Sequence, residues 1–272
     1  MITRAPAVAG SFYPGSPDQL RREIDGYLSQ KHPSAGVEIK PKALIVPHAG
    51  YYYSGAVAAD AYRMVAGEEF DLVVILAPSH HHYFTGASIY SIGNYETPLG
   101  EVKVDCELAE SLIAQYPAIN FIAEAHRQEH SLEVQLPFLQ VVLGDFMMLP
   151  LILGEQSWDM AENLAEIIAD LARNRRLLLI ASTDLSHFHD AETAEFLDRQ
   201  IVDAVAAFDP AAFWSLIENR QAEACGAGPL LTVMQAALKL RARRAEILTY
   251  RHSGMVSGDN DRVVGYLAAA LY

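Results

Sequence analysis

Three short, uninterrupted apolar runs constrain the fold of this chain more than any other feature. They are Ala43–Val46, Leu72–Leu76 and Leu177–Ile180. A strand with one face in water alternates apolar and polar residues, whereas a strand without polar positions needs both faces covered. All the apolar runs of the chain are far too short to span a bilayer. The three runs therefore predict buried strands inside a largely parallel sheet.

Segments with helical spacing separate these strands. The first is well marked, because Ser16 can cap it, Pro17 suits its first turn, and Leu20, Ile24 and Leu28 form an apolar stripe. Further helices are predicted at residues 54–65, 105–115, 131–143, 158–172, 190–208 and 228–241, with a short one starting at 209–210, and further strands at 87–92, 146–153, 245–250 and 263–268.

Strands and helices thus alternate from end to end. This order predicts a layered α/β fold, with a largely parallel or mixed central sheet and helices on both faces. Pro137 must kink or break the helix predicted for residues 131–143. Residues 32–37 form a loop-like segment, but no linker or internal repeat divides the sequence. We therefore expect residues 1–272 to form a single domain with a large core.

Composition limits the partners and the compartment. The formal net charge of −14 repels nucleic acid and anionic membranes, so neither is an expected partner, and the charge also favours solubility. Cys106 and Cys225 are too few for a disulfide framework. The first ten residues lack the apolar core of a signal peptide. We expect a reduced, cytoplasmic protein.

Chemically capable residues follow each of the three apolar runs. His48 comes after the first, Ser79 and His80 after the second, and Asp184 and His187 after the third. Ligands of open α/β sheets bind outside the carboxyl ends of the strands, which parallel strands place on one side. The sequence therefore predicts one pocket that collects side chains from distant parts of the chain.

His48 and His80 are candidate metal ligands. A lone histidine at a strand end is usually a satisfied loop residue, but its repetition after two strands favours metal binding, because neutral imidazole is the commonest protein ligand for a transition metal. In the run His80-His81-His82, alternate side chains of an extended segment point opposite ways. We take His80 as the inward one, and His81 and His82 as surface or supporting residues.

Asp184 and His187 are spaced for a shared role. On a helical turn, residues three apart face the same side. Asp184 could then orient the imidazole, and His187 could act as a general base. A helix N-cap at Asp184 with a surface histidine nearby explains the spacing equally well, so both interpretations stay open.

Cys225 is the third candidate ligand. Gly226 and Gly228 let the backbone approach a site closely. The helix predicted to follow would lower the pKa of the thiol and favour a thiolate, which can bind a metal or attack a substrate. The alternative is a small buried apolar residue, an interpretation that fits Cys106 better.

Four further side chains are candidates for the pocket wall or for substrate contact. His130 and Glu133 share one helical face if their helix begins early enough. Among the tyrosines at 51–53, packing explains two, and we take Tyr53 as the substrate-contacting phenol. Ser79, directly before His80, is placed in the pocket with them.

Seven motifs, from near residue 4 to the C-terminus, together resemble the Memo family. Each alone is weak, but their combination in this order is highly specific. They are Arg4-Ala-Pro-Ala-Val-Ala-Gly-Ser-Phe-Tyr-Pro14, Pro47-His-Ala-Gly-Tyr51, Ala77-Pro-Ser-His-His81, Glu129-His-Ser-Leu-Glu-Val-Gln-Leu-Pro137, Ser182-Thr-Asp-Leu-Ser-His187, Ala224-Cys-Gly226 and Val256-Ser-Gly-Asp259.

The resemblance implies an α/β fold related to the class III extradiol dioxygenases, which open catechol rings with non-haem Fe(II). It implies that His48 and His80 stand at the family's two metal histidines. Cys225 stands at the family's cysteine, where the related dioxygenases use a glutamate ligand. Asp184 and His187 match the remaining pocket pair, with His187 at the place of the dioxygenase base. The implied cofactor is iron or copper, with zinc less favoured.

Cysteine in place of glutamate leaves three functions open, because a thiolate is a softer ligand and is itself oxidisable. The first is a metal-dependent oxidoreductase, and the second is a non-catalytic protein that binds metal, or a small molecule or peptide. The third is a zinc hydrolase, since two histidines and a cysteine with an open position form a known catalytic zinc set. The resemblance also implies a system shared with an AMMECR-type protein and a radical SAM protein.

Overall fold

The computed structural model describes residues 2–30 and 40–272, so the loop predicted at residues 32–37 lies outside the described residues. The strands are β1 (Ala43–Val46), β2 (Leu72–Pro78), β3 (Ala87–Ile89), β4 (Tyr95–Thr97), β5 (Gly100–Val104), β6 (Ile119–Asn120), β7 (Met147–Leu153), β8 (Leu177–Ser182), β9 (His187–His189), β10 (Ala245–His252) and β11 (Val263–Leu271). The helices are α1 (Pro17–Leu28), α2 (Tyr51–Tyr62), η1 (Arg63–Val65), α3 (Cys106–Gln115), α4 (Ala123–Arg127), α5 (His130–Glu133), α6 (Leu136–Leu143), α7 (Trp158–Leu171), α8 (Ala191–Ala206), α9 (Pro210–Glu218), α10 (Ala227–Lys239) and α11 (Gly254–Ser257). Within the described residues, no helix has both the length and the apolar character needed to cross a membrane.

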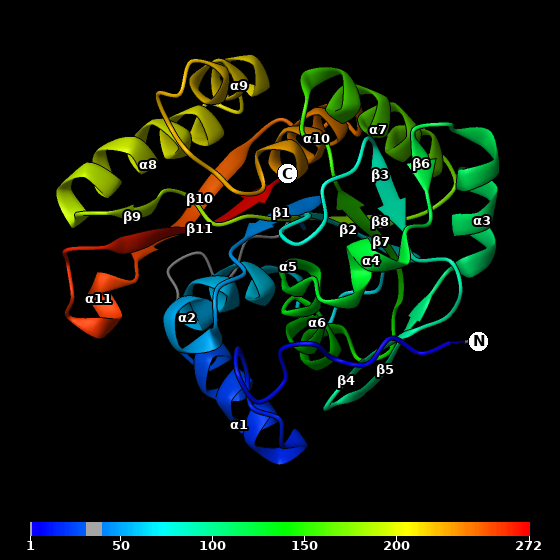
Figure 1. The fold of residues 1–272 in the computed structure, drawn as a ribbon, viewed down its shortest axis with the longest axis horizontal. Coiled ribbons are helices and arrows are strands. Elements are labelled where there is room, and N and C mark those ends of the chain that lie inside the picture. The colour runs from blue at the N-terminus through cyan, green and yellow to red at the C-terminus, as the bar shows by residue number, and fades with distance from the viewer. Residues whose placement is uncertain (1, 31–39) are drawn as a thin grey trace.

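The strands form one sheet in the order β10-β11-β1-β8-β2-β7-β3-β6 (Figure 1). β5 joins β7, β4 pairs with β5, and β9 pairs with β11. The four central strands β1, β8, β2 and β7 are parallel neighbours. β11 pairs antiparallel with β1, and β3 pairs antiparallel with β7. The predicted layered α/β fold with a mixed central sheet is confirmed.

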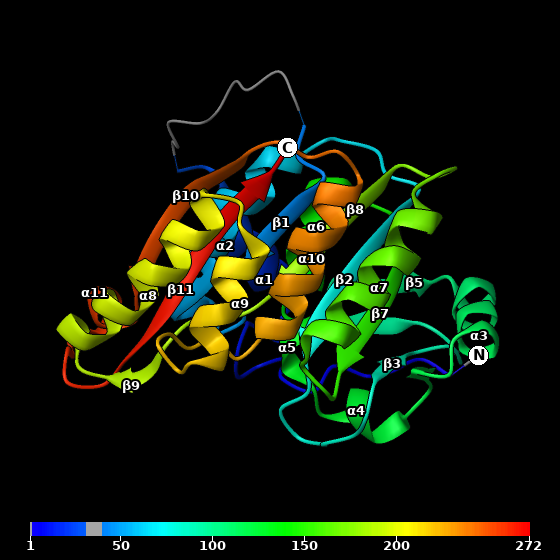
Figure 2. The same cartoon turned by 90° about the horizontal axis from the view of Figure 1, so that it is seen from above.

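Both faces of the central strands are covered, as their unbroken apolar sequences predict. In β2, Val74 and Leu76 belong to one core, and Val73 and Ile75 belong to the other. Successive side chains of a strand point to opposite faces, so a strand inside two layers has no position for a polar residue. Figures 1 and 2 show α7, α8, α9 and α10 on one face and α1, α2 and α6 on the other.

Most predicted elements agree with the structure to within a few residues. The helix predicted for residues 131–143 is two helices, α5 and α6, and Pro137 lies in the first turn of the second. α2 begins at Tyr51 rather than at residue 54, with Gly50 as its N-cap. The chain between Asp184 and His187 is not helical, because it leaves β8 and enters β9. The helical spacing considered for this pair is therefore wrong.

A buried carboxylate fastens the N-terminal segment to the rest of the fold. Glu133 on α5 is fully buried, and it pairs with the guanidinium of Arg4. It also accepts hydrogen bonds from the Tyr13 hydroxyl and from the backbone N–H groups of Ala7 (2.7 Å) and Val8 (3.0 Å). A buried charge needs such a full set of partners to offset its desolvation.

We expect Glu133→Ala to lower the free energy of unfolding by about 3–5 kcal/mol, because Arg4 would stay buried without its partner. Urea denaturation at pH 7 measures the loss. Asp203→Ala is the control, since it removes an exposed partner of Arg199 and should cost less than about 1 kcal/mol. Equal losses in the two variants would contradict the anchoring role.

Candidate metal centre

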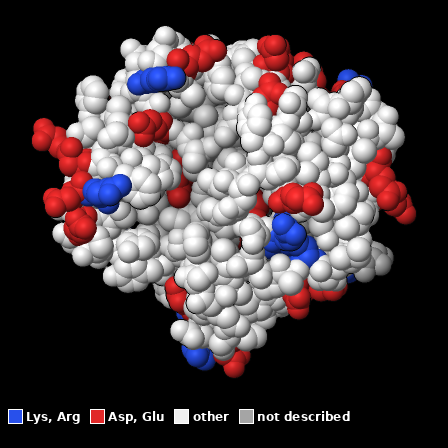
Figure 3. Space-filling model, viewed as in Figure 1, with Lys and Arg blue, Asp and Glu red and all other residues white. Residues whose placement is uncertain are grey.

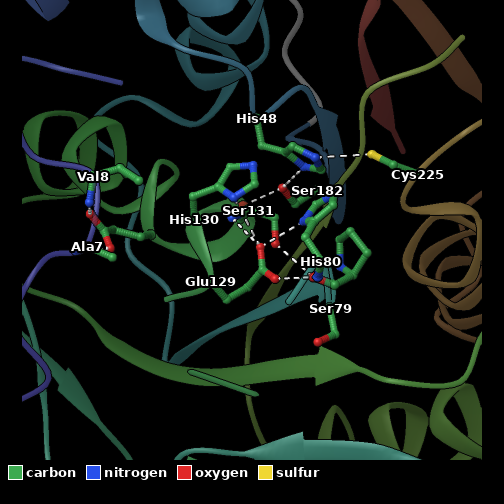
Figure 4. Close-up of polar contacts among 12 residues, drawn as sticks. Ala7, Val8, His48, Ser79, His80, Glu129, His130, Ser131, Ser182 and Cys225 are labelled. Atoms are coloured by element: carbon green, nitrogen blue, oxygen red, sulfur yellow. Dashed lines mark hydrogen bonds and ion pairs between the residues drawn. The ribbon is translucent and has the colours of Figure 1, made fainter. Parts of the chain in front are cut away.

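Three parallel strands end at the same edge of the sheet, and the residues after them meet there. His48 follows β1, His80 follows β2 and Asp184 follows β8. The ring centres of His48 and His80 lie 5.2 Å apart. Figure 4 shows the two rings close together, with the Cys225 thiol beside His48. On the face seen in Figure 1, charged side chains lie around the rim and also near the middle, where acidic side chains lie beside a basic one (Figure 3).

His48, His80 and Cys225 form a candidate metal-binding set. Each offers one ligand atom, and these atoms all lie within 4.8 Å of one another. The Sγ atom of Cys225 lies 3.1 Å from Nε2 of His48. His48 is buried, Cys225 is half-buried and His80 is exposed, so the set opens to solvent on the His80 side.

The turn before α10 holds Cys225 against the end of β8. The backbone N–H of Cys225 donates to the carbonyl of Asp184 (3.2 Å), and the N–H of Asp184 donates to Sγ (3.2 Å). A Cβ at Gly226 would lie 2.3 Å from the carbonyl oxygen of Ser182, so this close approach requires glycine. Gln156, after β7, donates to the Cys225 carbonyl (2.9 Å) and secures the turn from outside.

A buried carboxylate orients His80. Glu129, with 2% of its surface exposed, accepts hydrogen bonds from Nδ1 of His80 (2.8 Å), from the backbone N–H of His80 (2.6 Å) and from the N–H of Ser131 (3.0 Å). Burial opposes ionisation of Glu129, but these bonds and the His80 charge outweigh it and hold the pKa of Glu129 well below its ordinary value. An ionised carboxylate only accepts, so Nδ1 of His80 carries a proton, and Nε2 is the nitrogen left to face a metal.

Glu129 is a site residue that the sequence-based assignment missed. It stands 49 positions from His80, and only the fold brings the two together. Its position at the N-cap of α5 is the one local signal for it, because acidic residues favour helix starts. That signal points to a cap and says nothing about a histidine partner. Ser182, whose hydroxyl oxygen lies 2.9 Å from Nδ1 of His48, is a second missed residue.

His48 is neutral at pH 7. Burial lowers its pKa well below the ordinary value, and the neighbouring His80 and His130 lower it further. Neutral imidazole is the form that binds metals. Nδ1 of His48 lies 2.9 Å from the hydroxyl oxygen of Ser182, and the ring is buried at the end of β1.

The structure gives Asp184 a partner other than His187. Its carboxylate accepts a hydrogen bond from the backbone N–H of His48 (2.8 Å), so it braces the chain that carries this imidazole. Burial raises the pKa of Asp184 to about 7, although the bond from His48 opposes the shift. Near neutral pH, Asp184 can therefore hold or release a proton beside the three candidate ligands.

His187 opens β9 and is half-buried. Burial lowers its pKa, a backbone hydrogen bond at Leu185 opposes the shift, and the charge of His80 adds to it, so the imidazole is neutral at pH 7. The next residue, Phe188, has a φ of +63°, and β9 has an extra residue opposite Val263 and Val264. Such a bulge redirects neighbouring side chains and is common next to active sites.

His130 packs beside both candidate metal histidines. Its ring centre lies 4.7 Å from that of His80 and 5.6 Å from that of His48. Burial lowers the pKa of His130 to about 4. Together with Glu129 and His80 it forms a second group whose ligand atoms lie within 4.8 Å of one another. His130 thus lies beside the candidate ligands, and the wall role expected for it stays a prediction.

The other predicted pocket residues have different surroundings. The carboxylate of Glu133 contacts Arg4 and the N-terminal segment rather than the pocket. The ring of His130, on the same helix α5, packs against His80 instead. The Ser79 hydroxyl donates to the carbonyl of His82 (2.6 Å) and shapes the turn that carries His80. Tyr53 lies in the first turn of α2, 40% exposed.

The position of Cys225 before a helix predicts a lowered thiol pKa, but the structure raises it. Burial raises the pKa of Cys225, and the nearby Asp184 carboxyl raises it further. These effects outweigh the hydrogen bonds at Asp184, Thr183 and Gly226 that lower the pKa, so without a metal the thiol keeps its proton at pH 7. A metal must displace this proton to bind the sulfur, which makes metal affinity dependent on pH.

The fold is of the α/β class, with a mixed β-sheet between two layers of helices. Its site is a candidate His/His/Cys metal centre. The family model described as Memo-like protein matches residues 4–270. A MEMO1 family protein of Methanosarcina barkeri is 40% identical, over 97% of this chain and 98% of its own length. One of Nitrosopumilus maritimus is 36% identical, over 97% of this chain and 98% of its own length. The chain belongs to the Memo family.

A solved structure with low sequence similarity shares the fold. The crystal structure of an uncharacterised protein from Escherichia coli K12 superposes with a TM-score of 0.54 at 13% identity, and the match covers 84% of this chain and 99% of that chain. At this level of identity the similarity concerns the arrangement of strands and helices. It carries no assignment of chemistry.

We expect Asp184→Asn to become more stable relative to the wild type as the pH rises from 4 to 7. The folded wild type keeps the Asp184 proton up to about pH 7, whereas the unfolded chain loses it near pH 4. The wild type therefore loses stability across this window, by on the order of 4 kcal/mol, and the asparagine variant does not.

Urea denaturation of both proteins in chelator at pH 4, 5.5 and 7 measures this difference. Asp190→Asn is the control with the opposite sign, because hydrogen bonds from Thr193 lower the pKa of Asp190. A constant difference between wild type and Asp184→Asn over the window would contradict the raised pKa of Asp184.

Proposed function

We propose that the chain binds a redox-active transition metal, iron or copper, through His48, His80 and Cys225, and uses it for oxidoreductase chemistry. The observation that supports this most strongly is the convergence of two imidazoles and a thiol, from three separate segments, within 4.8 Å. Imidazole nitrogen and thiolate sulfur are ligands for copper, iron and zinc, and they are poor ligands for magnesium or calcium.

The donors are chemically prepared for such a metal. Nδ1 of His80 donates to Glu129, so Nε2 is the nitrogen left to face a metal. His48 is neutral, and the Cys225 thiol can release its proton on binding. Three protein ligands leave further positions for substrate. A bound iron or copper ion would supply the redox chemistry that these side chains lack.

In this proposal His187 and Asp184 transfer protons. The neutral imidazole of His187 can accept a proton from a substrate hydroxyl, and a base of this kind contributes about 10²–10⁴-fold to a rate. Asp184, with a pKa of about 7, can exchange a proton in the same range of pH. Its bond to the N–H of His48 keeps this group next to the ligand set.

The thiol favours a second candidate, metal or ligand binding without turnover. A thiolate is soft, suits Cu(I) or zinc, and is itself oxidised, which makes it a poor substitute for a carboxylate in oxygen chemistry. On this reading the site holds a metal, or presents a surface to a peptide or small molecule. A zinc hydrolase, with Asp184 or His187 activating water, ranks third.

Cys225→Ala should lose most of its bound metal, because one of three ligands is removed. Cys106→Ala is the matched control, since Cys106 is also a half-buried free thiol, and its Sγ contacts the carbonyl of Gly93 (3.6 Å). Elemental analysis of protein purified without added metal measures iron, copper and zinc. Unchanged metal in Cys225→Ala would remove Cys225 from the ligand set, and a predominance of zinc would favour the hydrolase.

His187→Gln should keep its metal and lose roughly 10²–10⁴-fold in turnover, because the proton acceptor is removed and the ligands stay. Oxygen uptake by anaerobically loaded protein against a panel of catechols measures this. If the loaded wild type turns over no substrate, the binding function is favoured over the oxidoreductase.

We also propose the partners that the family resemblance implies, an AMMECR-type protein and a radical SAM protein. Isolation of the tagged chain from its native cells, followed by identification of bound proteins, tests this association. Recovery of a radical SAM protein would support a role within a modification system.

A further inference from the structure

We propose that two buried residues, Gln135 and Ser182, act as positioning residues that fix the tautomer of His48 and so present its Nε2 as the metal-facing atom. The inference rests on the proposed metal site. It is carried by a chain of hydrogen bonds in which the direction of every bond is determined, from Tyr62 through Gln135 and Ser182 to His48. Gln135, Ser182 and His48 are 1%, 0% and 2% exposed.

The amide of Gln135 has only one acceptable orientation. Its Nε2 lies 3.0 Å from the carbonyl oxygen of Pro47 and 2.8 Å from the hydroxyl oxygen of Ser182. A carbonyl oxygen only accepts, so the nitrogen must be on that side. The amide oxygen accepts from the Tyr62 hydroxyl (2.7 Å) on the other side. Gln135 therefore donates to Ser182.

The hydroxyl of Ser182 has one hydrogen, and its position is also determined. Its oxygen lies 2.6 Å from the carbonyl oxygen of Ser131, which can only accept, so the hydroxyl donates there. One of its lone pairs accepts from Gln135. The remaining lone pair faces Nδ1 of His48 at 2.9 Å. Two lone pairs at that distance would repel, so Nδ1 of His48 carries the proton.

With the proton on Nδ1, Nε2 of neutral His48 has its lone pair available. That atom lies 3.1 Å from Sγ of Cys225, whose thiol hydrogen it can accept in the metal-free protein. When a metal binds, the thiol proton leaves and the lone pair is already directed at the site. Fixing the tautomer of a metal-ligating histidine through its other nitrogen raises its affinity as a ligand.

One turn of the chain orients both histidines. The carbonyl of Ser131 accepts the hydroxyl hydrogen of Ser182, and the N–H of Ser131 donates to the Glu129 carboxylate that accepts from His80. Figure 4 shows these contacts converging on the segment from Glu129 to Ser131. Both imidazoles thereby carry a proton on Nδ1, which leaves Nε2 as the nitrogen that faces a metal.

The first test is the ring ¹⁵N spectrum of the metal-free wild type at pH 7. We expect a protonated Nδ1 and an unprotonated Nε2 for His48, with the signals assigned by their absence in His48→Gln. A protonated Nε2 would overturn the proposal. This measurement needs no metal, so it decides the tautomer even if the proposed metal function fails.

The second test compares Ser182→Ala with Ser88→Ala. The two serines are both 0% exposed, and each hydroxyl oxygen lies 2.9 Å from a histidine nitrogen, but Ser88 contacts His126, outside the site. We expect Ser182→Ala to shift the tautomer of His48 and to weaken copper binding by about 10–100-fold in a competition titration. Ser88→Ala should bind copper with an affinity within about threefold of the wild type. Its loss of stability should match that of Ser182→Ala, because each variant removes a buried hydroxyl that makes hydrogen bonds.

The two variants separate positioning from folding. If Ser182→Ala is folded and keeps the wild-type tautomer and affinity, the proposal is wrong. If both serine variants weaken binding equally, the effect is a general loss of stability and the positioning role is refuted. If Ser182→Ala does not fold, the ¹⁵N spectrum of the wild type still shows which nitrogen of His48 carries the proton. Absence of metal binding by the wild type would refute the proposed function and leave the tautomer result unaffected.

Discussion

The parallel pairing of β1 with β8, and of β8 with β2, is the constraint on which the site depends. Its register sets Val46 beside Ser182, so the two strands end together and their following residues meet. His48 and Ser182, 134 positions apart, come within hydrogen-bond distance for this reason. An antiparallel β8 would send Asp184 to the opposite edge of the sheet. Parallel pairing in turn needs helices on both faces, which the unbroken apolar strands require.

The second requirement is that buried polar groups find partners. The ends of the buried strands bring carbonyls, amides and imidazoles into a region with little water, where an unpaired group costs about 1–3 kcal/mol. The segment from Glu129 to Ser131 supplies many of these partners, since it contacts His80 and Ser182 and donates to the carbonyl of Pro78 (3.0 Å). The groups that form hydrogen bonds with the residues at the strand ends therefore also orient the candidate ligands.

Several site residues were predictable because a local rule points to them. His48 and His80 each follow a buried strand, and Cys225 comes directly before Gly226 and the start of α10. Glu129 and Ser182 had no comparable signal, because their role depends on partners far away in the sequence. The same reason explains why helical spacing failed for Asp184 and His187: the bond from the His48 backbone and the pairing of β9 with β11 determine their conformation.

The sequence by itself determined the layered α/β fold, the strands that carry the site and the kinds of ligand atoms available. Hydrophobic pattern and residue chemistry are local properties, so they can be read along the chain. The tertiary structure decided which groups meet Nδ1 of His48 and of His80, the partner of Asp184 and the direction of the pKa shift of Cys225. These properties depend on burial and on hydrogen-bond partners from other segments, and both exist only after the chain has folded.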